Sequence, residues 1–332
     1  MKKPLLIFLI TLLCFYSAQV KAQWVQTNGP ATGNVTCLAA VGGKIFAGTY
    51  GDGILSSTDE GATWLPSSSG LYNSVVYTIA VSGTNLFAGT GSGAFVSTDG
   101  GISWVYTSHG LSGSPNCIAA VGGNVFAGTN SGVYLSTDNG ANWSSRNIGL
   151  TNTNVSSLAI SGANIFAGTA GGGAFLSTDN GTNWVPINNG LTDPNIHELV
   201  ISGNKVFAGT NSGVFISTNN GTNWTAAGSS IPKTYILALA VYPSSGGNAN
   251  IYAGTWGSGV YLSTDDGANW TAVNSGLISL AIRSFASSGG SLFVGTNYDD
   301  NQYRTIASQL GARGFVLKEN LIELRKICGR EE

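Results

Sequence analysis

The sequence predicts an all-β fold, a seven-bladed β-propeller of four-stranded antiparallel blades, closed by the N-terminal strand and followed by a short α/β tail. The first observation behind this prediction is a repeat. The run Phe-Ala-Gly-Thr, twice with one substitution, recurs at intervals of 39–45 residues, starting at Phe46, Phe87, Phe126, Phe166, Phe207, Tyr252 and Phe293. A repeat of this length is typical of propeller blades and stacked units. The second observation is composition: 48 of 332 residues are glycine, which fits short strands joined by tight turns.

One repeat contains four expected strands. Within 155–190, apolar segments lie at Val155–Ile160, Ile165–Thr169, Ala174–Ser177 and Trp184–Ile187, separated by turns rich in Gly, Asn and Ser. Four short antiparallel strands make a propeller blade. So small a sheet cannot bury both faces alone, so we expect it to pack against neighbouring blades in a ring.

The third observation is an unpaired copy of the fourth strand at the N-terminus. Trp24–Gly29 matches Trp184–Gly190, but no first three strands precede it. We expect this segment to complete the last blade, so that the two ends of the chain are fastened together and no sheet edge stays open.

Six repeats carry the motif Ser-x-Asp-x-Gly-x-x-Trp, once with Asn for Asp. Its third position is Asp59, Asp99, Asp138, Asp179, Asn219 and Asp265, and its last is Trp64, Trp104, Trp143, Trp184, Trp224 and Trp270. The carboxylate is expected to accept backbone N–H bonds in a turn, the glycine to supply a positive φ and the indole to pack over the hairpin. Because Asn219 cannot act as an acid, a base or a strong cation ligand, the motif is predicted to be structural rather than catalytic or calcium-binding.

This motif resembles the Asp-box, or BNR, repeat of sialidases, sortilin-type receptors, xyloglucan-active glycosidases and the photosystem II assembly factor family. The resemblance covers roughly 24–296 and implies a sialidase-like superfamily propeller with WD40/YVTN-like repeats. It is weak evidence for function, because the fold hosts unrelated activities. Sialidases hold the substrate carboxylate with three arginines, whereas only Arg146 and Arg283 precede the tail here.

The other candidate chemistry is sparse. A glycosidase needs two facing carboxylates, and Asp193 and Glu198, beside His197, are interpreted as a solvated linker, as is His109. Cys37 and Cys117 occupy equivalent places two repeats apart, so they are expected to be free, buried thiols. The sequence therefore predicts no catalytic residue, no metal site and no cofactor.

The domain prediction has three parts. Residues 1–22 have a charged start, an apolar run and a small-residue cleavage site, which predict a signal peptide; the run is too short for a membrane anchor. Residues 23–301 form the propeller, with no later transmembrane segment. Residues 302–332 resemble the C-terminal end of a response-regulator receiver domain, with Gly311–Lys318 as its strand between two expected helices, Gln302–Leu310 and Glu319–Cys328. Such a fragment is too small to fold independently. Our hypothesis is that it arose by a gene fusion. Truncation after Asn301 is therefore expected to leave the stability of the propeller nearly unchanged.

The predicted function is an exported, non-enzymatic binding or scaffold module for a protein or glycan. Between Gln23 and Asn301, five Lys/Arg face twelve Asp/Glu, which argues against nucleic acid. The alternatives are an Asp-box glycosidase and a sensor or receptor piece of a longer chain. The candidate binding residues lie in loops between second and third strands, on blades adjacent after closure, and are Tyr50, Asp52, Trp256 and Tyr298. The alternative interpretation is that these aromatics only plug the mouth of the central channel.

Overall fold

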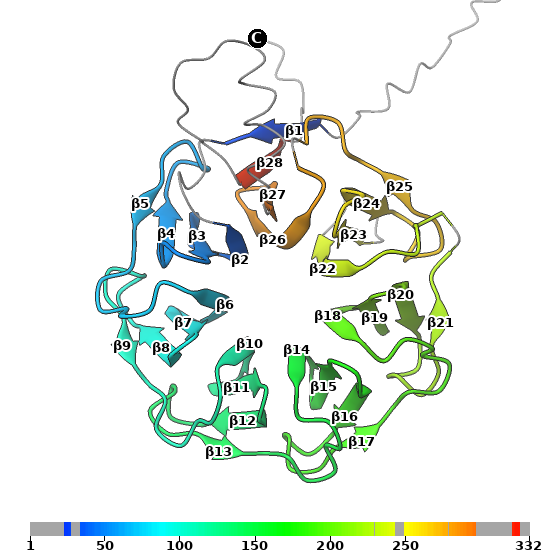
Figure 1. The fold of residues 1–332 in the computed structure, drawn as a ribbon, viewed down its shortest axis with the longest axis horizontal. Coiled ribbons are helices and arrows are strands. Elements are labelled where there is room, and N and C mark those ends of the chain that lie inside the picture. The colour runs from blue at the N-terminus through cyan, green and yellow to red at the C-terminus, as the bar shows by residue number, and fades with distance from the viewer. Residues whose placement is uncertain are drawn as a thin grey trace, which may run out of the picture.

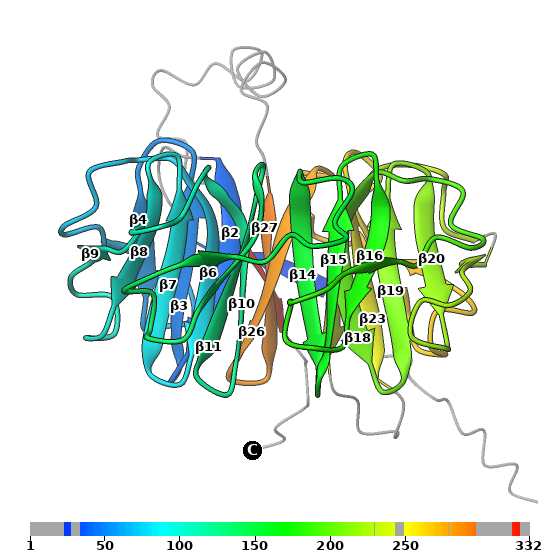
Figure 2. The same ribbon diagram turned by 90° about the horizontal axis from the view of Figure 1, so that it is seen from below.

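The computed structural model describes residues 23–27, 34–228, 230–242, 249–277, 279–296 and 321–325. Four-stranded antiparallel sheets stand side by side around a common axis, with one strand of each nearest the axis (Figure 1). Seen edge-on, the long strands run across the thickness of the ring (Figure 2). Residues 1–22, Tyr298, the expected helix at 302–310 and Cys328 lie outside the described residues.

Six blades each consist of four strands that follow one another in the sequence. Blades one to three comprise β2 (Val35–Val41), β3 (Lys44–Thr49), β4 (Ile54–Ser57) and β5 (Leu65–Pro66); β6 (Val76–Ser82), β7 (Asn85–Thr90), β8 (Gly93–Ser97) and β9 (Val105–Tyr106); and β10 (Pro115–Val121), β11 (Asn124–Thr129), β12 (Gly132–Ser136) and β13 (Ser144–Ser145). Blades four to six comprise β14 (Val155–Ser161), β15 (Asn164–Thr169), β16 (Gly173–Ser177) and β17 (Val185–Pro186); β18 (Ile196–Ser202), β19 (Lys205–Thr210), β20 (Gly213–Ser217) and β21 (Thr225–Ala226); and β22 (Ile236–Tyr242), β23 (Asn250–Thr255), β24 (Val260–Ser263) and β25 (Thr271–Ala272).

The predicted fold class is wrong in two respects. Among the described residues, the blades whose four strands follow one another in the sequence number six, not seven, because the sheet that contains the last Phe-Val-Gly-Thr run takes its outermost strand from the N-terminus. The predicted α/β tail is also wrong, since the described residues contain no helix. Within the expected helix Glu319–Cys328, Leu321–Arg325 is instead a strand, β28.

The strands left over form one composite sheet from both ends of the chain. β26 (Ile282–Ser288) and β27 (Ser291–Thr296) continue into β28 and then β1 (Gln23–Gln26), in the order β1-β28-β27-β26. The N-terminal strand thus lies at the outer edge, as the sequence predicted. β26 lies between β2 of blade one and β22 of blade six, which closes the ring. The expectation that residues 302–332 contribute little to stability assumed that none of them belongs to a blade. β28 pairs with both β27 and β1, which contradicts that assumption.

The core lies between blades. Phe46 and Ile54 of blade one form one buried cluster with Leu86, Phe95 and Trp104 of blade two, and this arrangement recurs around the ring. Each blade therefore buries its faces only against its neighbours, which makes the ring the stable unit.

The Thr that ends each Phe-Ala-Gly-Thr run caps a hairpin. In all six blades its buried hydroxyl donates to the carbonyl of a glycine that begins the third strand or directly precedes it, as Thr49 Oγ1 does to Gly53 O at 2.9 Å. This bond fixes the loops in which the candidate binding residues lie.

Candidate functional site

The Ser-x-Asp-x-Gly-x-x-Trp loops are closed by hydrogen bonds from their own residues. In the fourth loop, Asp179 Oδ1 accepts from Ser177 Oγ at 2.8 Å and from the Asn183 backbone N–H at 2.9 Å, while Oδ2 accepts from Asn183 Nδ2 at 2.7 Å. The glycine of every loop has a positive φ, as predicted, with Gly181 at 81°. These bonds, chiefly those from Asn183, lower the pKa of Asp179 to about 2, so the carboxylate is ionised and committed to the turn.

The fifth loop keeps this turn without a carboxylate. Asn219 Oδ1 accepts from Ser217 Oγ at 3.0 Å and from the Asn223 backbone N–H at 2.9 Å. An amide oxygen is therefore sufficient for the two bonds that define the turn, which is what the structural interpretation of the motif requires.

The sequence predicts that each motif tryptophan packs over its own hairpin. In the structure, several of them also hydrogen bond to the preceding blade. Four of them donate a hydrogen bond from Nε1 to the backbone carbonyl of the residue directly after the outermost strand of the preceding blade, at 2.6–2.7 Å. The pairs are Trp104 to Ser67, Trp143 to Thr107, Trp184 to Arg146 and Trp224 to Ile187. Trp24 makes the same bond to Val273 of blade six. Trp64 and Trp270 instead bond the glycine carbonyl of their own loops. The indoles thus fasten successive blades together.

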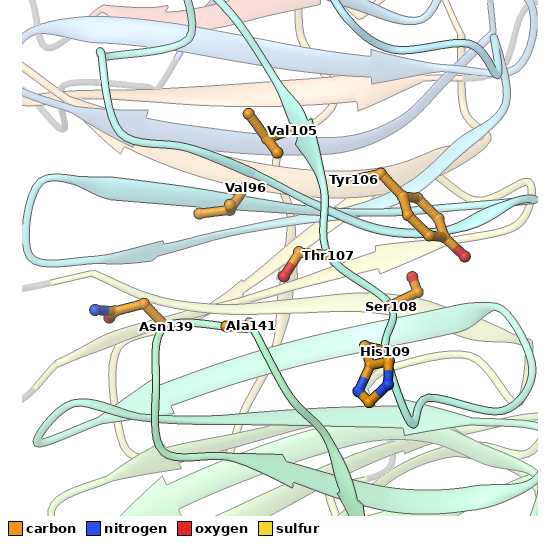
Figure 3. Close-up of a pocket in the computed structure, with 8 residues that line it drawn as sticks. All are labelled: Val96, Val105, Tyr106, Thr107, Ser108, His109, Asn139 and Ala141. Atoms are coloured by element: carbon orange, nitrogen blue, oxygen red, sulfur yellow. The ribbon is translucent and has the colours of Figure 1, made fainter.

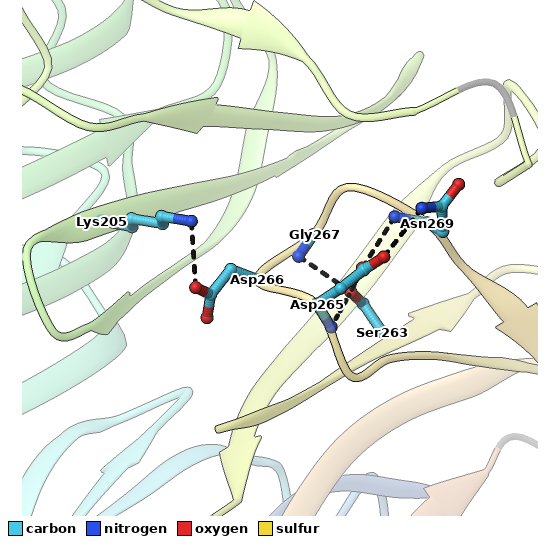
Figure 4. A network of polar contacts seen from close by, with 6 residues as sticks. All are labelled: Lys205, Ser263, Asp265, Asp266, Gly267 and Asn269. Carbon is cyan, nitrogen blue, oxygen red and sulfur yellow. Dashed lines mark hydrogen bonds and ion pairs between the residues drawn. The ribbon is translucent and has the colours of Figure 1, made fainter. Parts of the chain in front are cut away.

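The same rim carries polar contacts between some motif loops and the hairpin between the first and second strands of the preceding blade. Lys205 pairs with Asp266 at 3.2 Å, beside the hydrogen-bonded loop of Asp265 (Figure 4), and Lys44 Nζ donates to Gly100 O at 3.0 Å. We call this the motif rim. Lys44 donates to a backbone carbonyl and Lys205 pairs with Asp266, so these contacts make the motif rim a structural seam between blades.

The opposite rim, here the linker rim, holds the candidate binding residues. It consists of the loops between second and third strands and the blade-to-blade linkers, which hydrogen bond to each other: Tyr50 N donates to Asn34 O at 2.9 Å and Trp256 N to Tyr235 O at 3.0 Å. Tyr50 and Trp256 are 63% and 49% exposed, and Asp52 is also exposed. Tyr298 lies outside the described residues.

Arg283 connects the two exposed aromatics. Its guanidinium carbon lies 4.2 Å from the centroid of the Trp256 ring. Arg283 also lines a pocket of about 360 Å³ together with Asn34, Thr36 and Tyr50. We call this the Arg283 pocket. The sequence predicted that Tyr50 and Trp256 lie on the two blades that flank the last sheet after closure, but it assigned no role to the arginine of that sheet, which lies between them.

The position of Arg283 follows from a bulge shared by all inner strands. The pairing register shifts across the second residue of each of these strands, as between Val35 and Cys37 in β2 and between Ile282 and Ser284 in β26. The bulged residues are Thr36, Tyr77, Asn116, Ser156, His197, Leu237 and Arg283. Several of them link blades: Asn116 Nδ2 donates to Val155 O at 3.0 Å, and the hydroxyls of Thr36 and Ser156 bond the corresponding carbonyls of the next blades. An alignment of the repeats at this position shows that Arg283 is the one Lys or Arg among these seven residues.

The interpretation of Asp193 and Glu198 as a solvated linker is wrong. Asp193 is 7% exposed and caps a turn by accepting from Asn195 N at 3.0 Å. Glu198 belongs to inner strand β18, where Ser157 of the preceding blade donates to its Oε1 at 3.1 Å. Burial raises the pKa of Glu198 to about 7. Each carboxyl has structural hydrogen-bond partners, and His197 bonds Asn211 at 2.6 Å.

The two cysteines have no disulfide partner. Burial raises the pKa of the Cys37 thiol to about 12. It also raises the pKa of the Cys117 thiol, to which the nearby Glu198 contributes. Both cysteines are free, as expected, although each residue as a whole is only half-buried.

A second pocket of about 600 Å³ lies at the outer edge of blades two and three. Val96, Val105 and Tyr106 of blade two line it together with His109 of the following linker and Asn139 of the third motif loop (Figure 3). His109 is exposed, as expected of a linker histidine. The described lining contains no Asp, Glu, Lys or Arg, so it offers few charged groups for specific recognition.

Among the described residues, no group of three His, Cys, Asp or Glu side chains could hold a metal ion. Nor does this part of the chain contain a helix long and apolar enough to cross a membrane.

Comparison with known protein families identifies a matching family model. The model of the DUF6242 beta propeller domain matches residues 118–257 and 165–306. These overlapping matches together span 118–306, more than half of the chain. No curated protein sequence matches it.

Solved structures share the fold at low identity. The extracellular domain of the putative one component system BT4673 from B. thetaiotaomicron has a TM-score of 0.71 at 17% identity, over 92% of this chain and 40% of that one. The putative hybrid two component system BT3049 from the same organism gives 0.71 at 15%, over 92% and 41%. YCF48 bound to D1 peptide gives 0.69 at 18%, over 94% and 97%. The chain thus spans about two fifths of the length of these B. thetaiotaomicron extracellular domains.

Proposed function

The chain belongs to the DUF6242 beta propeller domain family, and on that premise we propose that it is an exported, non-enzymatic binding or scaffold module for a protein or glycan partner. The observation that carries this proposal is the Arg283 pocket with Trp256 stacked beside it. Exposed aromatic rings around a cation and an amide are a typical recognition surface, because ring faces supply area and the polar groups supply orientation.

A binding role is supported by what the polar groups already do. The motif carboxylates are held in turns, and Glu198 and Asp193 have hydrogen-bond partners within the fold. A glycosidase would instead need two carboxyls facing one substrate. We infer that the motif loops are Asp-box turns and that their conserved geometry serves the ring rather than a reaction.

Export is proposed from the signal-peptide pattern of residues 1–22. Extracellular domains of putative sensor systems have the same fold, which supports a location outside the cytoplasm. Those proteins are much longer than this chain, so a role as the sensing piece of a larger assembly is a second form of the same proposal. The YCF48 structure with D1 peptide supports a peptide as one class of ligand for such a ring.

The test is a combined glycan and peptide array. We expect ligands bound by the native chain to be lost by a Tyr50→Ala/Trp256→Ala double variant. A Tyr106→Ala variant serves as the control, because Tyr106 is as exposed as Trp256, at 49%, but lies on outer strand β9. If both variants retained a ligand, the linker rim would not be its site.

A further inference from the structure

Two tyrosines at blade two have no counterpart in the other repeats. At the place of Tyr106, two residues after the motif tryptophan, the other copies have Pro66, Ser145, Pro186, Ala226 and Ala272. At the place of Tyr72, in the linker before β6, they have Ser112, Thr151, Thr192, Pro232 and Ile278. The two rings meet, with centroids 5.7 Å apart. Side chains that depart from the repeat and meet in space indicate a role that the fold itself does not require.

The ring of Tyr106 is held by two neighbouring rings. The buried Phe95 packs against it edge-on with centroids 5.4 Å apart, and Tyr72 packs edge-on against Phe95 at 5.0 Å. Tyr106 nevertheless remains 49% exposed and lines the pocket of about 600 Å³ at the outer edge of blades two and three. It therefore presents a supported aromatic surface to this pocket, and a supported ring loses little conformational freedom when a ligand binds to it.

The pocket also contains uncharged polar groups. His109 and Asn139 are exposed and line it together with Tyr106 (Figure 3). Within the described part of the chain, the phenol oxygen of Tyr106, the imidazole of His109 and the amide of Asn139 have no hydrogen-bond partner. Asn180, at the place of Asn139 in the next motif loop, instead accepts from Asn124 Nδ2 at 3.3 Å. A phenol, a neutral imidazole and an amide can each both donate and accept, as a sugar hydroxyl does.

We propose that this pocket binds a short neutral saccharide, with one sugar ring on the face of Tyr106 and its hydroxyls hydrogen bonded to His109 and Asn139. The site is separate from the Arg283 pocket and does not depend on it. A volume of about 600 Å³ lies within the range of about 300–1,000 Å³ that is typical of small-ligand sites.

Other ligand classes fit this pocket less well. An anion would find no Lys or Arg in the lining, and the acidic balance of residues 23–301 would repel it. A peptide could add as a strand only where the outer edge of a sheet is open. Beside β9 that edge is occupied, because Trp143 donates from Nε1 to Thr107 O at 2.7 Å and from its backbone N–H to His109 O at 2.8 Å.

The repeat supplies substitutions that the fold already accepts. Tyr106→Ala introduces the residue found at Ala226, His109→Ser the one at Ser69 and Asn139→Gly the one at Gly100. Gly100 has a φ of 69°, close to the 56° of Asn139, so the turn is kept. Ile148→Ser is the matched control, because Ile148 is 67% exposed and has the place of His109 in the next blade.

The experiment measures the Kd of the full chain by calorimetry for hexasaccharides of glucose, mannose, galactose and xylose, with a hexasaccharide of galacturonate as the anionic probe. We expect the native chain to bind at least one neutral hexasaccharide and not the anionic one. Tyr106→Ala should weaken binding by about tenfold or more, whereas Tyr106→Phe, which keeps the ring, should weaken it less. His109→Ser and Asn139→Gly should each weaken it about fivefold, the effect of one lost hydrogen bond. Tyr72→Ser should also weaken it, and Tyr72→Phe should restore it, because Tyr72 acts by positioning Tyr106.

Three results would overturn the inference: no binding of any neutral hexasaccharide, an unchanged Kd in Tyr106→Ala, or an equal loss in Ile148→Ser and His109→Ser. A saccharide lost by Tyr50→Ala/Trp256→Ala and retained by Tyr106→Ala would also overturn it, while supporting the proposed function at the linker rim. The reverse pattern would support this second site whether or not the linker rim binds a ligand.

Discussion

Glu198 differs in character from the side chains at the same place in the other inner strands. Those are small or neutral: Cys37, Thr78, Cys117, Ser157, Ala238 and Ser284. The carboxyl of Glu198 is bonded to Ser157 and lies near Cys117. No cation is among the causes that shift its pKa. Its ionisation therefore costs free energy in the folded chain.

This cost predicts a pH dependence. The folded pKa of about 7 lies above the ordinary 4.5. Between these two values Glu198 is mostly ionised in the unfolded chain and mostly protonated in the folded chain, so ionisation favours the unfolded chain as the pH rises. Stability should fall as pH rises from about 5 to 8, by no more than about 3 kcal/mol, since the side chain keeps some solvent contact. Urea unfolding at both pH values should show a smaller fall for Glu198→Gln. The exposed Glu60→Gln should behave like the native chain, and an unchanged slope in Glu198→Gln would contradict the account.

The pH dependence of stability due to Asp179 has the opposite direction to that due to Glu198. Its pKa of about 2 lies below the ordinary 3.8, so its stabilising effect is present above pH 4 and is lost as pH falls toward 2. We expect Asp179→Asn to lower the melting temperature slightly, because Asn219 holds the same turn, and Asp179→Ala to lower it more. Equal losses in the two variants, measured at pH 7, would show that the negative charge itself is required.

At the scale of the element, the indoles of four motifs donate a hydrogen bond from the loop of one blade to the outer edge of the preceding blade. Trp143 is 5% exposed and donates to Thr107 O at 2.7 Å. Trp64 is only half-buried and donates within its own loop at 3.1 Å. We expect Trp143→Ala to reduce the free energy of unfolding by about 3–5 kcal/mol, and Trp64→Ala to cost clearly less. Chemical denaturation compares the two directly; a larger loss for Trp64→Ala would show that contact across blades is not what matters.

The inner strands also show where sequence reasoning succeeds and where it stops. The register of Phe46, the loop role of Asp179 and the closing role of Trp24 follow from repetition, because each copy repeats the same local contacts. Glu198 was assigned to a linker because the bulge at His197 breaks the alternation that identifies a strand. The sequence does not predict the contact of Arg283 with Trp256, because the two residues lie on different blades and no single repeat contains both of them.

At the scale of the whole molecule, the ring depends on a sheet assembled from both ends of the chain. β28 lies between β27 and β1, a position that local sequence cannot reveal because the segment does not resemble the repeat. Thr296 marks the same discontinuity: its buried hydroxyl has no hydrogen-bond partner, whereas the six equivalent threonines cap a hairpin.

Truncation tests this closure. Ending the chain after Asn301 removes β28 and leaves β1 without its neighbour, so we expect the melting temperature to fall by roughly 5 °C or more. Ending it after Cys328 keeps β28 and should have little effect. Calorimetry on the three proteins makes the comparison, and identical transitions would mean that β28 does not contribute to the closed ring.

The composite sheet also determines how the molecule would respond to mechanical load. Gln23 is paired with Arg325 at one end of the ladder between β1 and β28, so both strands leave the sheet from the same end. A force that separates the two chain ends acts on that first pair and then on each following pair in turn, like a zipper. The six repeat-built blades, whose strands are continuous, carry the load only after this sheet has opened. Tension would thus open the ring at the sheet adjoining the Arg283 pocket.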